Sequence, residues 1–135
     1  MKRYTILEHK ADLKLRAFGK TKEELFSNML LAMVSVLQAK TKEQKLKTKN
    51  IKVKSSDLNL LLVDFLSEAL YLIQVDKVLY SKVKFRNFTD TEIEAELAGQ
   101  KVERFGEEIK AVTYHNLDIH QEKNGVWQAT VLFDI

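Results

Sequence analysis

Hydrophobic and polar residues alternate with a period of two along much of this 135-residue chain, which is typical of strands with one buried face. In one such segment, Leu13, Leu15 and Ala17 alternate with lysine and arginine. The dipeptide Asn124-Gly125 favours a tight hairpin turn between its flanking strands. The alternation predicts strands over Arg3–Glu8, Leu13–Phe18, Lys49–Ser55, Leu79–Arg86, Thr91–Leu97, Lys110–His120 and Val126–Ile135, with a polar loop over Gly99–Glu108.

Two segments instead have the spacing of amphipathic helices. Thr21 followed by Glu24 is a capping-box pattern, in which each side chain satisfies an otherwise unpaired backbone N–H. We therefore expect helices from Thr21 to about Gln38 and from a cap at Ser56 or Asp57 to about Gln74. Their buried stripes would be Leu25, Met29, Ala32, Met33 and Val36 in the first helix, and Leu58, Leu61, Leu62, Phe65, Ala69, Leu70 and Ile73 in the second.

The order of these elements predicts an α+β fold. Most strands follow one another as hairpins, rather than alternating with helices as in a parallel sheet. The length of 135 residues is close to the usual size of one domain, and no linker or internal repeat divides the chain. We therefore expect residues 1–135 to form a single two-layer domain, with a largely antiparallel sheet and two main helices packed on one face.

The composition excludes several classes of protein. Hydrophobic residues make up 45% of the chain and charged residues 30%, so it is not a disordered or low-complexity protein. It has no cysteine, which excludes disulfides, thiolate nucleophiles and cysteine-ligated metal centres. Its four glycines are too far apart for a glycine-rich phosphate loop. No apolar run approaches about 18 residues and no cationic leader opens the chain, so we expect a cytoplasmic protein without a membrane segment.

The segment Lys40–Lys54 is the most basic part of the chain, with seven lysines and one acid, Glu43. In one interpretation it is a solvated loop followed by an edge strand that its charges protect from aggregation. In the other, its lysines and those of Lys82–Arg86 contact RNA phosphates. No aromatic residue lies between the lysines of Lys40–Lys54, so base stacking has no support there. The net charge of +3 does not by itself indicate a nucleic-acid binder.

Three oxygen-bearing groups are candidates for a metal site. Asp134 is the penultimate residue, and Ile135 ends the chain with an α-carboxylate that is held beside Asp134 if the Ile135 side chain enters the core. Two adjacent carboxylates are unfavourable without a compensating cation. Together with Asp12, just before the second strand, they would offer the hard oxygen ligands that suit Ca²⁺, Mg²⁺ or Mn²⁺. The alternative is a frayed C-terminus, and the sequence does not place Asp12 near residue 134.

Two further pairs of polar residues carry weaker signals. Lys110 and His115 are five residues apart, so they face opposite sides of a regular strand unless a bulge brings them together. Asp64 and Glu68 share one strip of the second helix, where like charges are tolerated on a wet surface or serve to meet a cation. His115 taken alone is typical of a hydrogen-bonded structural histidine. No serine nucleophile with a base and an orienting acid is evident, so we expect no catalytic residue.

Four motifs together resemble the archease family, in the right order and at the right separations over essentially the whole chain. They are His9–Asp12 followed by Arg16–Thr21, the segment Leu61–Leu72, the segment Ile109–His115, and the terminal Phe133-Asp134-Ile135. The set is more specific than any one motif. The chain departs from the family pattern at Lys10, Lys14, Phe65 and Ser67, where Thr, Gly, Trp and Asn are usual. These departures concern partner affinity more than the proposed metal ligands.

The resemblance implies an accessory protein rather than an enzyme. Archeases promote guanylylation and multiple turnover of RtcB-type RNA ligases, which act in tRNA splicing and RNA repair. Carried over, Asp12, Asp134 and the C-terminal carboxylate of Ile135 would hold a divalent cation, and Lys110 would lie beside them. His9, Asp64, Glu68 and His115 match motif positions whose roles stay open. The partner would be the ligase, with tRNA contacted indirectly or weakly. The alternatives are an RNA-binding or chaperone module that uses the lysine-rich surfaces, and a free-standing metal-dependent hydrolase.

Overall fold

The computed structural model of the protein describes residues 1–42 and 45–135, and for His9 the backbone alone. Glu43, the one acid of the basic stretch, lies outside the described residues. In the described part the chain forms two helices, α1 (Lys22–Val36) and α2 (Leu58–Asp76). The strands are β1 (Tyr4–His9), β2 (Asp12–Gly19), β3 (Lys40–Thr41), β4 (Lys47–Lys54), β5 (Val78–Phe88), β6 (Glu92–Arg104), β7 (Ala111–Val112), β8 (Asp118–Gln121) and β9 (Trp127–Asp134).

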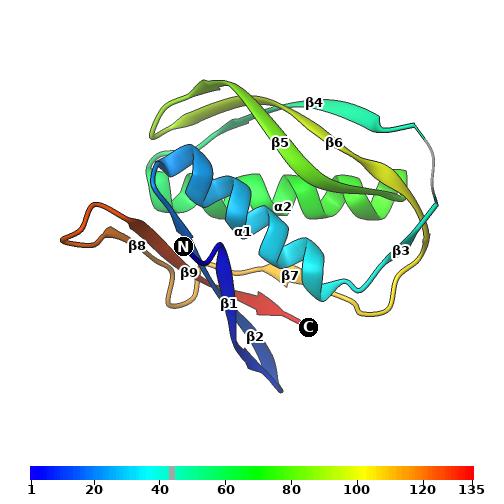
Figure 1. The fold of residues 1–135 in the computed structure, drawn as a ribbon, viewed down its shortest axis with the longest axis horizontal. Helices are drawn as coiled ribbons and strands as arrows, with labels where there is room; N and C mark the ends of the chain where they lie inside the picture. The colour runs from blue at the N-terminus through cyan, green and yellow to red at the C-terminus, as the bar shows by residue number, and fades with distance from the viewer. Residues whose placement is uncertain (43–44) are drawn as a thin grey trace.

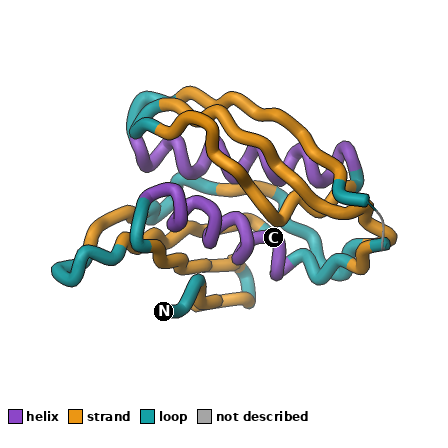
Figure 2. Tube along the Cα trace, turned by 45° about the horizontal axis from the view of Figure 1, so that its top comes forward, coloured by secondary structure: helices purple, strands orange, loops and turns teal. Residues whose placement is uncertain are grey.

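The described strands form two antiparallel sheets (Figure 1). One has five strands in the order β1-β2-β9-β7, with β8 also paired to β9. In the other, β6 pairs with β3, β4 and β5. The two helices lie between the sheets and contact strands of both (Figure 2). The α+β class and the antiparallel pairing are therefore confirmed, whereas the strands divide between two sheets instead of forming one sheet with both helices on a single face.

The broad apolar surface of α2 explains why two sheets are needed. Nine of its nineteen residues are buried, which is more than a single narrow stripe can supply, so the helix must be covered on more than one side. By length and hydropathy, α2 is also the one described helix that could cross a membrane. Half of that apolar stretch is buried inside the protein, as it is in a core helix, and Asp64 and Glu68 interrupt it.

The predicted helix boundaries are confirmed to within two residues. The Thr21 hydroxyl accepts a hydrogen bond from the Glu24 N–H (3.1 Å), as in a capping box. In a capping box the glutamate side chain would accept in return from the N–H of Thr21. Here the Glu24 carboxylate accepts instead from the N–H of Lys20, one residue earlier (3.2 Å). At the start of α2 the Asp57 carboxylate accepts from a first-turn N–H at 2.9 Å. Lys77 ends α2 in the left-handed conformation, with φ of 56°.

The central strand of the four-stranded sheet, β6, is longer than the sequence pattern predicts. Residues 99–108 were expected to form a polar loop, but β6 continues to Arg104 and its last residues pair with β5 and β3. Gly99 does not end the strand; it lies where β6 and β5 approach each other closely. A Cβ at position 99 would lie 1.9 Å from the carbonyl oxygen of Leu79 in β5. Residues 105–110 form neither helix nor strand, so the second part of the predicted loop, residues 105–108, is confirmed.

The predicted strand Lys110–His120 is divided into two short strands. Both β7 and β8 pair with β9, on the side opposite β2, but the chain leaves the sheet between them. Asn116 adopts a positive φ of 53° in this loop, and the Tyr114 hydroxyl donates a hydrogen bond to Asp64 of α2 (2.9 Å). The hydrogen bond joins residues 50 positions apart in the chain, so the local alternation of residues could not indicate it. Lys110 and His115 therefore do not share a regular strand.

The edge strand expected in the basic stretch is confirmed, because β4 pairs with β6 alone among the described strands. Its lysines lie next to acidic residues of the central strand β6. Lys52 is 3.6 Å from Glu92 and 3.2 Å from Glu94. Arg86 of β5 is 3.1 Å from Glu96 of the same central strand. This compensation favours the protected-edge interpretation over a surface built to bind phosphate.

Candidate metal centre at the C-terminal tip

The antiparallel pairing of β2 with β9 places Asp12 directly opposite Asp134. The two residues form the last pair of an eight-residue ladder that runs without a register shift from Gly19 opposite Trp127. Because such a ladder fixes every pair in it, the two carboxylates are held together by the whole length of both strands. The structure thus brings together two of the predicted ligands from opposite ends of the chain.

Side-chain alternation decides which face of the sheet the two acids occupy. Leu13 and Phe133, the next pair along, are fully buried against the helices. Asp12 and Asp134 therefore point to the outer face, and both are exposed. Directly opposed residues in an antiparallel pair have Cβ atoms about 4.5–5.5 Å apart. Neither carboxylate has an ion-pair partner among the described residues, which leaves two adjacent negative groups uncompensated.

The end of the chain is fixed in the sheet rather than frayed. Ile135 is partly buried and packs against the hydrophobic core, as the metal-site hypothesis requires. On the other side of β9, Asp134 lies opposite Ala111 of β7, and its carbonyl accepts a hydrogen bond from the Lys110 N–H (2.7 Å). The terminal carboxylate follows directly from this anchored residue. A third oxygen group is consequently held at the same end of the sheet.

The Lys110 side chain is exposed next to this tip. Its backbone N–H ties the preceding loop to Asp134, but its ammonium forms none of the ion pairs found among the described residues. It also lines a cavity of about 420 Å³ together with Gln74, Lys77 and Glu108. The ammonium is therefore exposed and has no acidic partner within the described part of the chain.

Asp64 has a structural role that the sequence did not indicate. Its two carboxylate oxygens accept hydrogen bonds from the Ser55 hydroxyl (2.6 Å) and the Tyr114 hydroxyl (2.9 Å). The bond to Asp64 raises the pKa of Tyr114, because loss of the phenolic proton would place two negative charges side by side. Asp64 thus fastens α2 to the loop that follows β7, and through β7 to the strand that carries Asp134.

The remaining residues with an open role do not join the tip in a way that the structure describes. Glu68 is half-buried on α2 and forms no ion pair within the described chain. His115 is exposed in the loop after β7, where its backbone N–H donates to the Thr113 hydroxyl (3.3 Å). His9 is the last residue of β1 and pairs with Leu13, but its side chain lies outside the described part of the structure.

The donor set has the chemistry that suits a hard divalent cation. Carboxylate oxygens suit Ca²⁺, Mg²⁺ and Mn²⁺. No group of three or more His, Cys, Asp or Glu side chains suited to a metal occurs among the described residues, so the third ligand at this tip would be the chain terminus itself. Two side chains and one terminus fill only part of the six or more oxygen positions that such ions take. Open positions would therefore remain for water or for a partner's phosphate.

A charged cluster at the opposite end of the same sheet was missed by the sequence analysis. The His120 ring nitrogens lie 2.6 Å from Asp118 and 2.8 Å from Glu122. These two bonds, that to Glu122 first, raise the pKa of His120. The signal was the spacing of an acid, a histidine and an acid at every second residue, which places all three on one face of a strand. Because both ring nitrogens are occupied by carboxylates, the cluster is an internally satisfied ion network.

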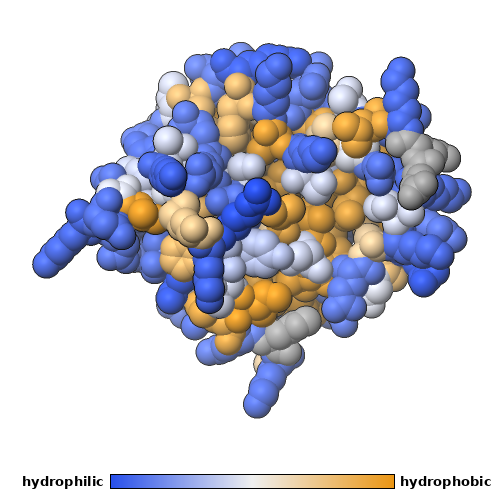
Figure 3. Space-filling model, viewed as in Figure 1, coloured by the Kyte–Doolittle hydropathy of each residue, from blue (hydrophilic) through white to orange (hydrophobic). Residues whose placement is uncertain are grey.

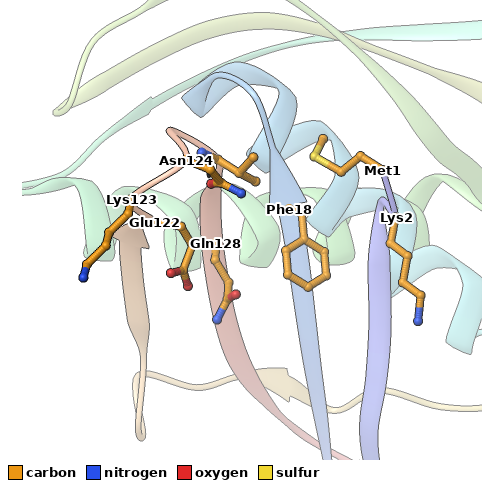
Figure 4. A pocket seen from close by; sticks show the side chains of 8 residues that line it. Met1, Lys2, Phe18, Glu122, Lys123, Asn124 and Gln128 are labelled. Atoms are coloured by element: carbon orange, nitrogen blue, oxygen red, sulfur yellow. Dashed lines mark hydrogen bonds between the residues drawn. The ribbon is translucent and has the colours of Figure 1, made fainter.

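The cavity of about 590 Å³ shown in Figure 4 belongs to that end of the molecule. Phe18 and Gln128, which pair across β2 and β9, lie at its centre, between the N-terminus and the β8–β9 turn. It is lined by Met1, Lys2, Phe18, Glu122, Lys123, Asn124, Val126 and Gln128. The ladder between Phe18 and Asp12 separates this cavity from the acidic tip, so it contributes nothing to the candidate metal centre.

Comparisons with known proteins agree with this architecture. The archease protein family (MTH1598/TM1083) matches residues 4–135. A protein archease from Methanosarcina barkeri is 41% identical over 99% of this chain and 97% of its own length. One from Pyrococcus furiosus is 33% identical over the full length of both chains.

Two solved structures share the fold. The solution structure of protein 1598 from Methanobacterium thermoautotrophicum superposes with a TM-score of 0.72 at 27% identity, with both chains fully covered. The crystal structure of a Thermotoga maritima protein, described as "an archease, possible chaperone", has a TM-score of 0.73 at 21% identity and covers 97% of this chain and 96% of its own. The similarity in sequence and in fold extends over essentially the whole chain, which belongs to the archease family.

Proposed function

We propose that this protein is a cytoplasmic accessory protein of an RtcB-type RNA ligase, which promotes metal-dependent guanylylation of the ligase and its multiple turnover in tRNA splicing and RNA repair. The observation that carries the proposal is the pairing of Asp12 with Asp134 beside the anchored chain terminus. Membership in the archease family supports it. The protein would have no catalytic residue of its own.

The geometry of the tip suits an activator better than an enzyme. Asp12 and Asp134 lie on an exposed outer face rather than in a closed cavity, so a second macromolecule can reach them. A divalent cation held by these oxygens would supply the positive charge that a leaving pyrophosphate needs during nucleotidyl transfer. The protein's contribution is then to present the two carboxylates in a fixed register at the nucleotide site of the ligase.

Lys110 would serve the same step as an anion-binding group. Its backbone is fastened to Asp134, which fixes the root of the side chain next to the tip, and the side chain is exposed. A lysine in this position can contact a phosphate that the carboxylates alone would repel. We expect Lys110→Ala to weaken stimulation of the ligase while leaving cation binding by the protein largely intact.

The principal test is a guanylylation assay with the ligase, GTP and Mn²⁺ or Mg²⁺. Asp134→Ala should abolish the stimulation, and one extra residue after Ile135 should do the same because it displaces the terminal carboxylate. Asp118→Ala, which removes an exposed acid at the far end of the sheet, is the matched control and should stimulate like the unaltered protein. Circular dichroism would verify that all three variants are folded. Full stimulation by folded Asp134→Ala would refute the proposed mechanism.

Cation binding can be measured without the ligase. Isothermal titration of Mn²⁺ into the protein should give a binding curve that Asp12→Asn and Asp134→Asn each weaken. The alternative of an RNA-binding or chaperone module predicts instead salt-sensitive tRNA binding that is lost when Lys52, Lys82 and Lys84 are neutralised. We expect weak tRNA binding at most, because glutamates of β6 neutralise part of this surface.

A further inference from the structure

The hairpin that carries Asp12 contains a bulge in its first strand. Ile6 pairs with Leu15 and Glu8 pairs with Lys14, so Leu7 is an additional residue with no partner in β2. A bulge of this kind twists the strand and changes the direction of the side chains around it. Here it interrupts the alternation that would otherwise send every second side chain of β1 to the buried face.

The consequence is a pair of adjacent exposed aliphatic side chains. Ile6 is 47% exposed and Leu7 is 37% exposed. β1 is an edge strand of the five-stranded sheet, and Figure 1 shows the β1–β2 hairpin projecting from the body of the protein near the C-terminus. The space-filling view has a hydrophobic patch over this hairpin (Figure 3). Edge strands are usually protected by charged residues, so two aliphatic side chains on a projecting edge call for a partner.

This apolar pair is continuous with the acidic tip. A hollow of about 500 Å³ is lined jointly by Leu7 and Asp12, with Glu8, Lys10 and Ala11 between them. Lys14 lies 3.9 Å from Glu8, so these two charges offset each other. Asp12, Asp134 and the chain terminus form no ion pair among the described residues, so the surface next to the apolar pair carries uncompensated negative charge.

We infer that the β1–β2 hairpin is the surface by which the protein docks on its ligase, with Ile6 and Leu7 entering an apolar depression beside cationic groups that face Asp12 and Asp134. The inference rests on the proposed function, and it assigns affinity and activation to different residues of one tip. Aliphatic side chains would supply the buried contact of the complex, whereas the carboxylates would act on the reaction once the complex has formed.

Charge complementarity selects a protein with a cationic site over the other occupants. A symmetric contact between two copies of this chain would bring each acidic tip against its equivalent, which is repulsive. RNA phosphates and anionic lipid headgroups would meet the same repulsion from Asp12 and Asp134 while no cation is bound there. A ligase site that holds a divalent cation beside cationic side chains would offer the positive charge that this tip lacks.

The test compares two double variants of similar exposure. Ile6→Ser with Leu7→Ser removes the proposed contact, and Tyr71→Ser with Val75→Ser removes exposed apolar side chains of α2, which are 58% and 57% exposed. Affinity for the ligase would be measured by biolayer interferometry and stimulation by the guanylylation assay at increasing protein concentration. We expect the β1 variant to bind at least about tenfold more weakly, with full stimulation recovered at saturating concentration, since loss of central apolar contacts lowers affinity. The α2 variant should bind like the unaltered protein.

The outcomes separate this inference from the proposed function. Unchanged affinity of a folded β1 variant would overturn the docking surface, while loss of stimulation by Asp134→Ala would still support the proposed function. Weaker binding by the α2 variant instead would place the docking surface on α2. If light scattering shows a dimer that the β1 substitutions convert to a monomer, the patch is a contact between copies and the inference is wrong. If the unaltered protein neither binds nor stimulates the ligase, both proposals fail.

Discussion

Replacing Phe133 by alanine tests the placement of Asp134 through the packing of its neighbour. Phe133 is fully buried in β9, where it lies opposite Leu13 of β2 and Val112 of β7. Truncation of a buried phenylalanine to alanine costs about 3–5 kcal/mol, a large part of the roughly 5–15 kcal/mol that stabilises a domain of this kind. Leu132 precedes it on the opposite face of β9 and is half-buried, so Leu132→Ala should cost about 1 kcal/mol.

The assay is urea denaturation at pH 7, followed by the far-ultraviolet circular dichroism of each variant. Phe133→Ala should lower the transition midpoint much more than Leu132→Ala, with an unchanged denaturant slope in both. Comparing the two variants shows which face of β9 is buried, because a one-residue change of register exchanges the two faces of a strand. If Leu132→Ala is the more damaging change, β9 has the opposite orientation. Asp134 would then face the core, and the candidate metal centre would not exist.

Three further predictions test other contacts. Hydrogen bonding to Glu122 raises the pKa of His120, so its contribution to stability is complete below about pH 6.5 and is lost as the pH rises through the folded-state pKa. Glu122→Gln should lower the His120 pKa in an NMR titration, and an unchanged titration would contradict the bond. Gly99→Ala places a methyl group 1.9 Å from the Leu79 carbonyl and should destabilise the fold by about 1–3 kcal/mol or more in urea denaturation; a neutral effect would show that the strands can separate there. Asp57→Ala removes the α2 cap and should cost about 1 kcal/mol in the same assay, and no loss would mean that water replaces the cap.

The helices and most strands were determined by local sequence. Caps such as Thr21 and Asp57 act on backbone groups within one turn, so the pattern that predicts them is contained in a few neighbouring residues. Strand alternation is also local, and the strand that it predicts over Val126–Ile135 is observed as β9. The hairpin at Asn124-Gly125 follows from the same kind of information, because Gly125 adopts the positive φ (89°) that the turn requires.

Where the local pattern failed, a distant partner had decided the structure. β6 extends beyond Gly99 because β3 and β5 pair with its far end, and the strand predicted over Lys110–His120 is interrupted where Tyr114 reaches Asp64 of α2. The division into two sheets has the same origin. Alternation shows that a strand has one buried face, but it does not show which sheet supplies its neighbours.

The candidate site shows the same division between local and tertiary information. The sequence by itself supplied the chemistry: two aspartates, a terminal carboxylate after an aliphatic residue, and a family pattern that marks them. Only the tertiary structure set Asp12 opposite Asp134, placed both on the outer face and anchored Ile135 against the core. The physical reason is that strand pairing joins residues from the two ends of the chain, and its register is fixed by the burial of all the side chains along β2 and β9 together.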